Sequence, residues 1–222
     1  MVSEDLIEGL VQKYVRDNDV IAIGTGRHGE TFLKKLALYT EEQGLNVRVI
    51  PTSVKHAGIA SSLGLKLASM NGKEIDLAFE FVDMVDKNYN YIKRDSSSLI
   101  RDKMIAQSAA VLIAIAREQD MVSRLKGRIP FEVSPFGHGR TLLQLDSLGK
   151  AMLRSSGSAP YKTETNHFLI DVDVDAGYSL DDIEYKAHGI PGVVETGLFL
   201  GYADKLVLHD KGVRVESRTD YR

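Results

Sequence analysis

The 222-residue sequence contains no cysteine, which excludes disulfide bonds and thiolate metal ligands. It also has no run of about 20 apolar residues, so no membrane-spanning helix is expected. The opening stretch, MVSEDLIEGL, lacks the basic start and the apolar run of a signal peptide. Neither sign of charge is in large excess, and a net charge of -3 gives no general attraction for nucleic acid or for an anionic membrane. These absences predict a soluble cytoplasmic protein without nucleic-acid or membrane partners.

Apolar residues make up 43% of the chain, which is enough for a proper core. Up to Pro130, short apolar runs alternate with segments of helical spacing. The runs that predict strands are 20–23, 47–50, 75–81 and 110–116. The helical patterns are 6–14, 32–37, 59–65 and 99–109. Strands that alternate with helices indicate an α/β fold with a Rossmann-like, mostly parallel sheet that is covered on both faces.

The pattern changes after Pro130. The segments that read as strands are 131–134, 168–174 and 193–200. The helical segments are 139–149 and 179–188, and Ser179 is suited to be the N-cap of the second. This order of elements predicts a smaller α+β sandwich.

Residues 205–208 and 213–216 predict a closing hairpin across 210–212. We therefore expect a large α/β domain made of residues 1–130 and 203–222. Residues 131–202 are expected to form the α+β domain inserted in it.

A glycine-rich loop follows the first predicted strand. Its residues are Gly24, Thr25, Gly26, Arg27, His28 and Gly29. Open α/β sheets bind ligands at the carboxyl ends of their strands, and glycines let backbone N–H groups approach a phosphate at the start of the next helix. Arg27 either binds that phosphate or lies in solvent. The GxGxxG spacing is also found at dinucleotide-binding sites. The second predicted strand, however, ends at Pro51 and not at an acidic residue that would bind the ribose of a dinucleotide.

Histidines and alternating aspartates raise the question of a metal. The histidines near or within the smaller domain are His138, His167 and His188, and they have no ligand spacing with one another. Three aspartates share one face of a predicted strand: Asp171, Asp173 and Asp175. We expect that face to be solvated, and we predict no metal.

The segment IPGVVETGLF at residues 190–199 reads by itself as a turn at Pro191 and Gly192 followed by a strand. It resembles a segment near the C-terminus of the ribose-5-phosphate isomerase A family. Other pieces resemble that family in the same order: GTG at 24–26, PTS at 51–53, IDL at 75–77, IK at 92–93 and PFEV at 130–133. The resemblance covers nearly the whole chain.

This resemblance implies an isomerase of the pentose phosphate pathway that converts ribose 5-phosphate to ribulose 5-phosphate through an enediolate. It implies no cofactor, a sugar phosphate as the small-molecule partner, and a homodimer or homotetramer. It also implies that a small domain is inserted in a larger one and that the last strands return to the larger one.

The resemblance further implies four catalytic residues. Glu80 and Asp83 match two acidic positions of the family's Asp-Gly-Ala-Asp-Glu signature, Lys93 matches its lysine, and Asp102 matches its catalytic glutamate. Isomerisation needs a carboxylate that moves a proton between C1 and C2, and groups that stabilise the enediolate oxygens. Asp102 would be the proton shuttle, Lys93 with Glu80 would polarise O1 and O2, and Asp83 would assist at the ring oxygen.

For the phosphate, the resemblance implies the glycine-rich loop and one distant lysine. These residues are Gly24, Thr25, Gly26, Arg27, His28 and Lys126. Arg27 and His28 stand where the family's GTGST loop has its serine and threonine. Near the N-terminus, Glu4 and Asp5 stand where the family usually has a phosphate-binding lysine.

Other departures touch the catalytic positions. Glu80 is one methylene longer than the family's aspartate and Asp102 one methylene shorter than its glutamate, and a displacement of about 1 Å costs roughly a hundredfold in rate. Residues 94–98, with the sequence RDSSS, replace a glycine-rich loop. His56 replaces a threonine and is expected to be a partly exposed polar residue.

These departures leave four functions open. The first is the isomerisation of ribose 5-phosphate, and the second is the isomerisation of a related sugar phosphate. The third is a sensor that binds a sugar phosphate without turnover. The fourth is an assembly protein with a filled pocket.

Overall fold

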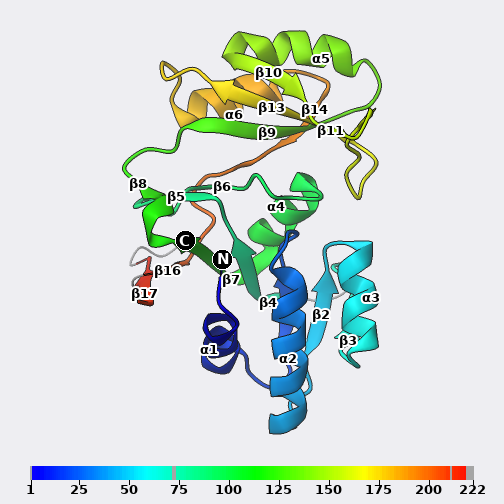
Figure 1. Cartoon of the computed structure of the whole chain (residues 1–222), viewed down its shortest axis with the longest axis vertical. Coiled ribbons are helices and arrows are strands. Elements are labelled where there is room, and N and C mark those ends of the chain that lie inside the picture. The colour runs from blue at the N-terminus through cyan, green and yellow to red at the C-terminus, as the bar shows by residue number, and fades with distance from the viewer. Residues whose placement is uncertain (1, 72–73, 211, 219–222) are drawn as a thin grey trace.

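The computed structural model describes residues 2–71, 74–210 and 212–218, and in this part of the chain seven strands form the main sheet (Figure 1). In spatial order they are β17 (Arg214–Ser217), β16 (Lys205–His209), β7 (Ala109–Arg117), β4 (Ile75–Phe81), β1 (Val20–Ile23), β2 (Arg48–Pro51) and β3 (Lys66–Leu67). All neighbouring strands are parallel except β16 and β17, which form an antiparallel hairpin. The predicted α/β class, the mostly parallel sheet and the closing hairpin are confirmed.

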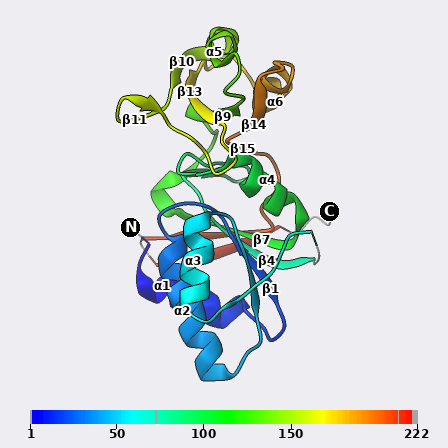
Figure 2. The same cartoon turned by 90° about the vertical axis from the view of Figure 1, so that its right-hand side faces the viewer.

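Helices cover both faces of this sheet, as Figures 1 and 2 show. They are α1 (Glu4–Tyr14), α2 (Gly29–Gln43) and α3 (Val54–Ser62) on one face, and α4 (Leu99–Ser108) on the other. Side chains of a strand alternate between faces, so Ile21 and Ile23 join the first core while Ala22 joins the second. Burial on both faces explains why β1 and most of β7 are continuous apolar runs in the sequence.

A second, antiparallel sheet lies beyond α4 (Figure 1). Its strands in spatial order are β10 (Gly149–Leu153), β13 (Phe168–Val174), β9 (Gly127–Val133) and β14 (Val193–Thr196). Two helices, α5 (His138–Leu145) and α6 (Leu180–His188), pack against it through Leu145 and Ile183. Ser179 caps α6 in a capping box with Asp182, so the predicted N-cap is confirmed.

The helix predicted at 139–149 is shorter than expected. After α5 the chain forms a 3₁₀ turn, η2 (Asp146–Leu148), and Gly149 then adopts a φ of 150° that favours glycine. The remaining short elements are η1 (Glu118–Asp120) and a small hairpin of β11 (Ser155–Ser156) and β12 (Ala159–Pro160).

Between the two larger sheets lies a third, of four short strands: β15 (Leu198–Phe199), β6 (Tyr91–Ile92), β5 (Met84–Asp86) and β8 (Met121–Val122). The strands β5 and β6 lie outside every segment that the sequence predicts as a strand, and a second segment, 193–200, is predicted as one strand where the structure has two. The second segment changes sheet at Gly197, whose N–H donates to the carbonyl of Pro130 at 2.7 Å and whose carbonyl accepts from the N–H of Lys93 at 3.0 Å. A Cβ at this position would lie 2.5 Å from Cγ of Pro130, so the crossing requires glycine.

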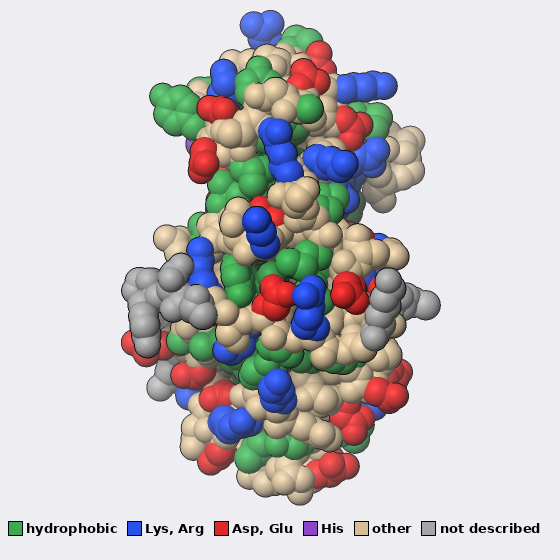
Figure 3. Space-filling model, turned by 90° about the vertical axis from the view of Figure 1, so that its left-hand side faces the viewer, with side chains coloured by type: hydrophobic (Ala, Val, Ile, Leu, Met, Phe, Trp, Pro, Cys, Tyr) green, Lys and Arg blue, Asp and Glu red, His purple; other side chains and the backbone are tan. Residues whose placement is uncertain are grey.

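The division into two domains stays a prediction, and its limit at Pro130 falls within β9. None of the helices among the described residues combines the length and the apolar character that crossing a membrane requires. On the face drawn in Figure 3, several basic side chains gather over the upper part of the molecule, and acidic and basic side chains are interspersed over the lower part.

Candidate active site

Three ionisable side chains, Glu80, Lys93 and Asp102, are fully buried where the main sheet meets α4. Glu80 lies near the carboxyl end of β4, Lys93 directly follows β6, and Asp102 lies in the first turn of α4. The ammonium of Lys93 contacts Oε2 of Glu80 and lies 3.0 Å from Oδ2 of Asp102. The structure thus brings together three of the four residues predicted to be catalytic, and we call them the buried triad.

Asp102 accepts hydrogen bonds on both carboxylate oxygens. The N–H of Thr25 donates to Oδ1 at 2.9 Å. The hydroxyls of Thr25 and Ser96 each donate to Oδ2 at 2.7 Å, in addition to the contact with Lys93. Hydrogen bonds to the ionised form of a carboxylate stabilise its charge. Asp102 is therefore the member of the buried triad that is best placed to carry a negative charge.

Glu80 lies in a less favourable place for a charge. Its Oε1 has no hydrogen-bond partner among the described residues, and its side chain is fully buried. Burial raises the pKa of Glu80 to about 8, the ammonium of Lys93 lowers it in part, and the charge of Asp102 raises it further. For Lys93, burial acts to lower the pKa, but the two carboxylates outweigh it and the pKa is raised. One cation thus balances one carboxylate, and Glu80 keeps a proton at neutral pH.

Protonation of Glu80 makes stability depend on pH. Because its folded-state pKa is about 8 and its model-compound value is 4.5, the folded chain keeps a proton that the unfolded chain loses between these values. The Glu80 contribution to the free energy of unfolding is full below pH 4.5 and falls by roughly 1 kcal/mol per pH unit as the pH rises toward 8. Urea unfolding at several pH values should show this slope in the wild type relative to Glu80→Gln. Parallel curves for the two proteins would contradict the assignment.

The glycine-rich loop lies directly against the buried triad. A Cβ at Gly24 would overlap the carboxylate of Glu80, so glycine is needed for this approach. Thr25 was predicted to bind phosphate, but its side chain is buried and its hydroxyl donates to Asp102. Gly26 has a φ of 130°, which turns the chain toward the start of α2.

Asp83, the fourth predicted catalytic residue, lies outside the buried triad. Its Oδ2 accepts the backbone N–H of Arg94 at 2.6 Å and that of Asp95 at 3.2 Å. Asp83 therefore holds the beginning of residues 94–98, which we call the RDSSS segment.

A cavity of about 260 Å³ opens beside this segment. Its lining includes Gly26, Arg27, His28, Phe81, Asp83 and Asp95. Burial and the charge of Arg27 lower the pKa of His28, so His28 is neutral at pH 7 and Arg27 is the cation that the glycine-rich loop offers. Lys126 lines another cavity, of about 180 Å³, together with Arg124 and Tyr178. The structure does not bring Lys126 and Arg27 into one cavity, and a shared phosphate contact stays a prediction.

His56 is buried, so the expectation of a partly exposed residue is wrong. It lies in the first turn of α3 and fills the space beside Gly29, where a Cβ would overlap its ring. Its Nδ1 lies 3.4 Å from the hydroxyl of Thr52, and burial lowers its pKa.

Asp171 also differs from expectation, because it is buried and not solvated. Its two carboxylate oxygens accept from Arg154 at 2.9 Å and 2.5 Å. Arg154 in turn donates to the carbonyl of Arg94 at 3.2 Å. This ion pair supports the RDSSS segment from the side of the second sheet.

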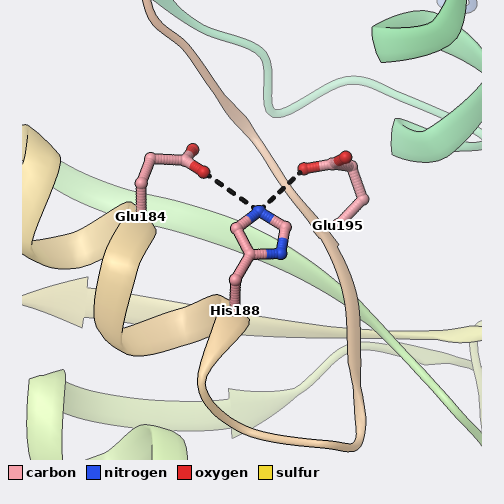
Figure 4. A group of neighbouring side chains, drawn as sticks. All are labelled: Glu184, His188 and Glu195. Atoms are coloured by element: carbon pink, nitrogen blue, oxygen red, sulfur yellow. Dashed lines mark hydrogen bonds and ion pairs between the residues drawn. The ribbon is translucent and has the colours of Figure 1, made fainter.

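A separate cluster joins α6 to β14 (Figure 4). Nε2 of His188 lies 3.1 Å from Oε2 of Glu184 and 3.5 Å from Oε1 of Glu195, and one donor atom from each residue lies within 4.8 Å of the others. These donor types suit a divalent cation. The ammonium of Lys103, however, lies 2.9 Å from Glu195 and 3.5 Å from Glu184 and already supplies the balancing charge. The absence of a metal stays a prediction.

A carboxylate and an ammonium buried side by side, next to a glycine-rich loop and a small cavity, are the means of acid–base chemistry on small anionic molecules. The place of these groups, at the carboxyl ends of parallel strands, is where open α/β folds bind ligands. The chain is therefore an α/β protein of the class that has its ligand site at the carboxyl ends of parallel strands. It belongs to the ribose 5-phosphate isomerase A (phosphoriboisomerase A) family, whose model matches residues 48–212.

Relatives and solved structures agree with this assignment. The ribose-5-phosphate isomerase A of Methanothermobacter thermautotrophicus is 34% identical over 200 residues, 87% of each chain. That of Sinorhizobium medicae is 31% identical over 205 residues, 88% of each chain. The structure of the Methanocaldococcus jannaschii protein has a TM-score of 0.88 and 26% identity, and the match covers 97% of both chains. A D-ribose-5-phosphate isomerase in complex with phospho-erythronic acid has a TM-score of 0.88 and 28% identity over 98% of this chain and 100% of that one.

Proposed function

We propose that the chain interconverts ribose 5-phosphate and ribulose 5-phosphate through an enediolate. The observation that carries this proposal is the buried triad, in which one ammonium lies between two carboxylates, at three of the four positions for which the resemblance to the family implies a catalytic role. An aldose–ketose isomerase needs a base for the carbon-bound proton and donors for the enediolate oxygens. The buried triad offers both kinds of group in one place.

The roles divide according to charge. Asp102, which carries the negative charge, takes the proton from C2 and returns it to C1. Lys93 stabilises the enediolate oxygens as charge develops, and the protonated Glu80 donates a hydrogen bond to one of them. Asp83 lines the neighbouring cavity and assists ring opening there.

The phosphate would lie at the glycine-rich loop, where the backbone turns at Gly26 into the start of α2 and Arg27 supplies a positive charge. The cavity beside this loop, about 260 Å³, is close to the lower end of the range for small-molecule sites, about 300 Å³. A pentose phosphate is the size of ligand that such a cavity admits.

A coupled assay of ribulose 5-phosphate formation tests the proposal. Ribose 5-phosphate is expected to be the best substrate, and arabinose 5-phosphate, allose 6-phosphate and glucose 6-phosphate serve as comparison substrates. Faster turnover of one of the others would keep the isomerase chemistry and change the substrate. No turnover of any of them would leave the proposal without support.

Full burial of the buried triad favours a second candidate, a sensor that binds a sugar phosphate without converting it. Asp102 already accepts four donors, so a sugar carbon has no access to it in this conformation. Calorimetry separates the two functions, since a sensor would bind ribose 5-phosphate and show no turnover. We also expect a homodimer or homotetramer, a cytoplasmic location and no nucleic-acid partner.

A further inference from the structure

The carboxylate of Asp95 lies on the glycine-rich loop. Its Oδ2 accepts from the backbone N–H of Arg27 at 3.3 Å and from Nε of Arg27 at 3.0 Å. Gly26 permits this approach, because a Cβ there would lie only 3.0 Å from the carbonyl oxygen of Asp95 and 3.5 Å from its Oδ2. A carboxylate from 68 residues along the chain therefore uses the backbone donor and the cation that the loop would offer to a phosphate.

The loop is a favourable place for an anion. Residues 26–28 lead directly into α2, a helix of 15 residues, and the helix N-terminus attracts negative charge. His28, the N-cap residue, makes no capping hydrogen bond with its side chain among the described contacts. The acidic group that lies next to this helix start is Asp95 of the RDSSS segment, bonded to Arg27 just before the N-cap.

The next residue, Ser96, acts on the buried triad. Its hydroxyl donates to Oδ2 of Asp102 at 2.7 Å and lies 3.0 Å from the hydroxyl oxygen of Thr25. Two consecutive residues of the RDSSS segment therefore engage two groups that the substrate would need. Asp95 forms an ion pair with Arg27, the cation proposed to bind the phosphate. Ser96 is hydrogen-bonded to the carboxylate of Asp102, the group proposed to take the proton from C2.

We propose that Asp95 is an internal competitor of the substrate phosphate, which displaces it from Arg27 and draws Ser96 away from Asp102. This inference rests on the proposed function, since it concerns the same site. The ion pair of Arg27 and Asp95 has side chains that are 65% and 47% exposed, so it is screened by solvent and easily exchanged. A phosphate carries up to two charges and three acceptor oxygens, against one charge on a carboxylate, and is the stronger partner for Arg27.

The test is calorimetric titration of the whole chain with inorganic phosphate and with ribose 5-phosphate. Asp95→Asn and Asp95→Ala should each bind both ligands about fivefold more tightly than the wild type. Asp173→Asn is the matched control, because Asp173 is also an exposed aspartate next to an arginine, Arg128, at 3.8 Å, and does not line this cavity. It should change affinity less than about twofold. Adding Arg27→Ala to Asp95→Asn should remove the gain.

Unchanged affinity in both Asp95 variants, or an equal gain in Asp173→Asn, overturns the inference. A gain that persists in the Arg27→Ala, Asp95→Asn variant overturns it as well. Turnover is scored separately from binding. If the Asp95 variants gain affinity and no sugar phosphate is converted, the isomerase proposal fails while the inference about Asp95 holds. If ribose 5-phosphate is converted but the Asp95 variants gain no affinity, only the inference about Asp95 fails.

Discussion

Replacing Asp102 by asparagine is expected to lower kcat for ribose 5-phosphate by about a thousandfold, a loss within the range for removing a general base. Asparagine keeps the size of the side chain, so the hydrogen bond from the Thr25 N–H to Oδ1 can remain. The dissociation constant for ribose 5-phosphate should change little, because the phosphate site lies at the glycine-rich loop. The coupled assay gives kcat, and calorimetry gives the dissociation constant.

Two further variants sharpen this prediction. Asp173→Asn is the control, since Asp173 is an exposed aspartate whose nearest cation, Arg128, lies 3.8 Å away, and it should keep wild-type kcat. Asp102→Glu restores the longer acid of the family and tests whether the pocket is adapted to the shorter one. Full activity in Asp102→Asn would remove Asp102 from the mechanism even if the chain proves to be an isomerase.

Replacing Lys93 by methionine is expected to lower the free energy of unfolding by about 3–5 kcal/mol, the usual result of removing one partner of a buried ion pair. Methionine has a similar length but no charge, so the buried Asp102 loses its only ammonium contact among the described residues. Urea unfolding, followed by circular dichroism, measures the loss. Catalysis should fall as well, because the enediolate loses its cation.

The matching control is Lys34→Met, whose lysine is exposed and pairs with Glu30 on the surface of α2. Its cost should stay below about 1 kcal/mol. The double variant Lys93→Met, Asp102→Asn should recover part of the stability, because the uncompensated charge is then absent. A loss in Lys93→Met no larger than in Lys34→Met would show that the buried triad is not an ion pair that stabilises the fold.

The main sheet was predictable from the sequence because β1 and β7 are buried on both faces and are nearly plain apolar runs, and β4 is apolar except at Asp76 and Glu80. The convergence of Glu80, Lys93 and Asp102 was predictable only through the family spacing. Their neighbours in the chain are unlike those of the family, and no local periodicity places an acid on β4 beside the first turn of α4. The short strands β5 and β6 escaped prediction because two or three residues carry too little pattern to separate a strand from a loop.

The surroundings of Asp102 could not be predicted either. Thr25 and Ser96 bond to each other across 71 residues of chain, and Thr25 bonds to Asp102 across 77. Such contacts depend on how the glycine-rich loop and the RDSSS segment approach in three dimensions. The burial of His56 has the same origin, since it follows from the contact of α3 with the start of α2.

The crossing at Gly197 has a consequence for motion. Its N–H is bonded to Pro130 in the second sheet, and its carbonyl holds the amide of Lys93. Any rotation of the second sheet against the first therefore strains or breaks the bond to Lys93. Hydrogen–deuterium exchange at the amide of Lys93 accordingly reports how often the second sheet moves away from the first, without any added ligand.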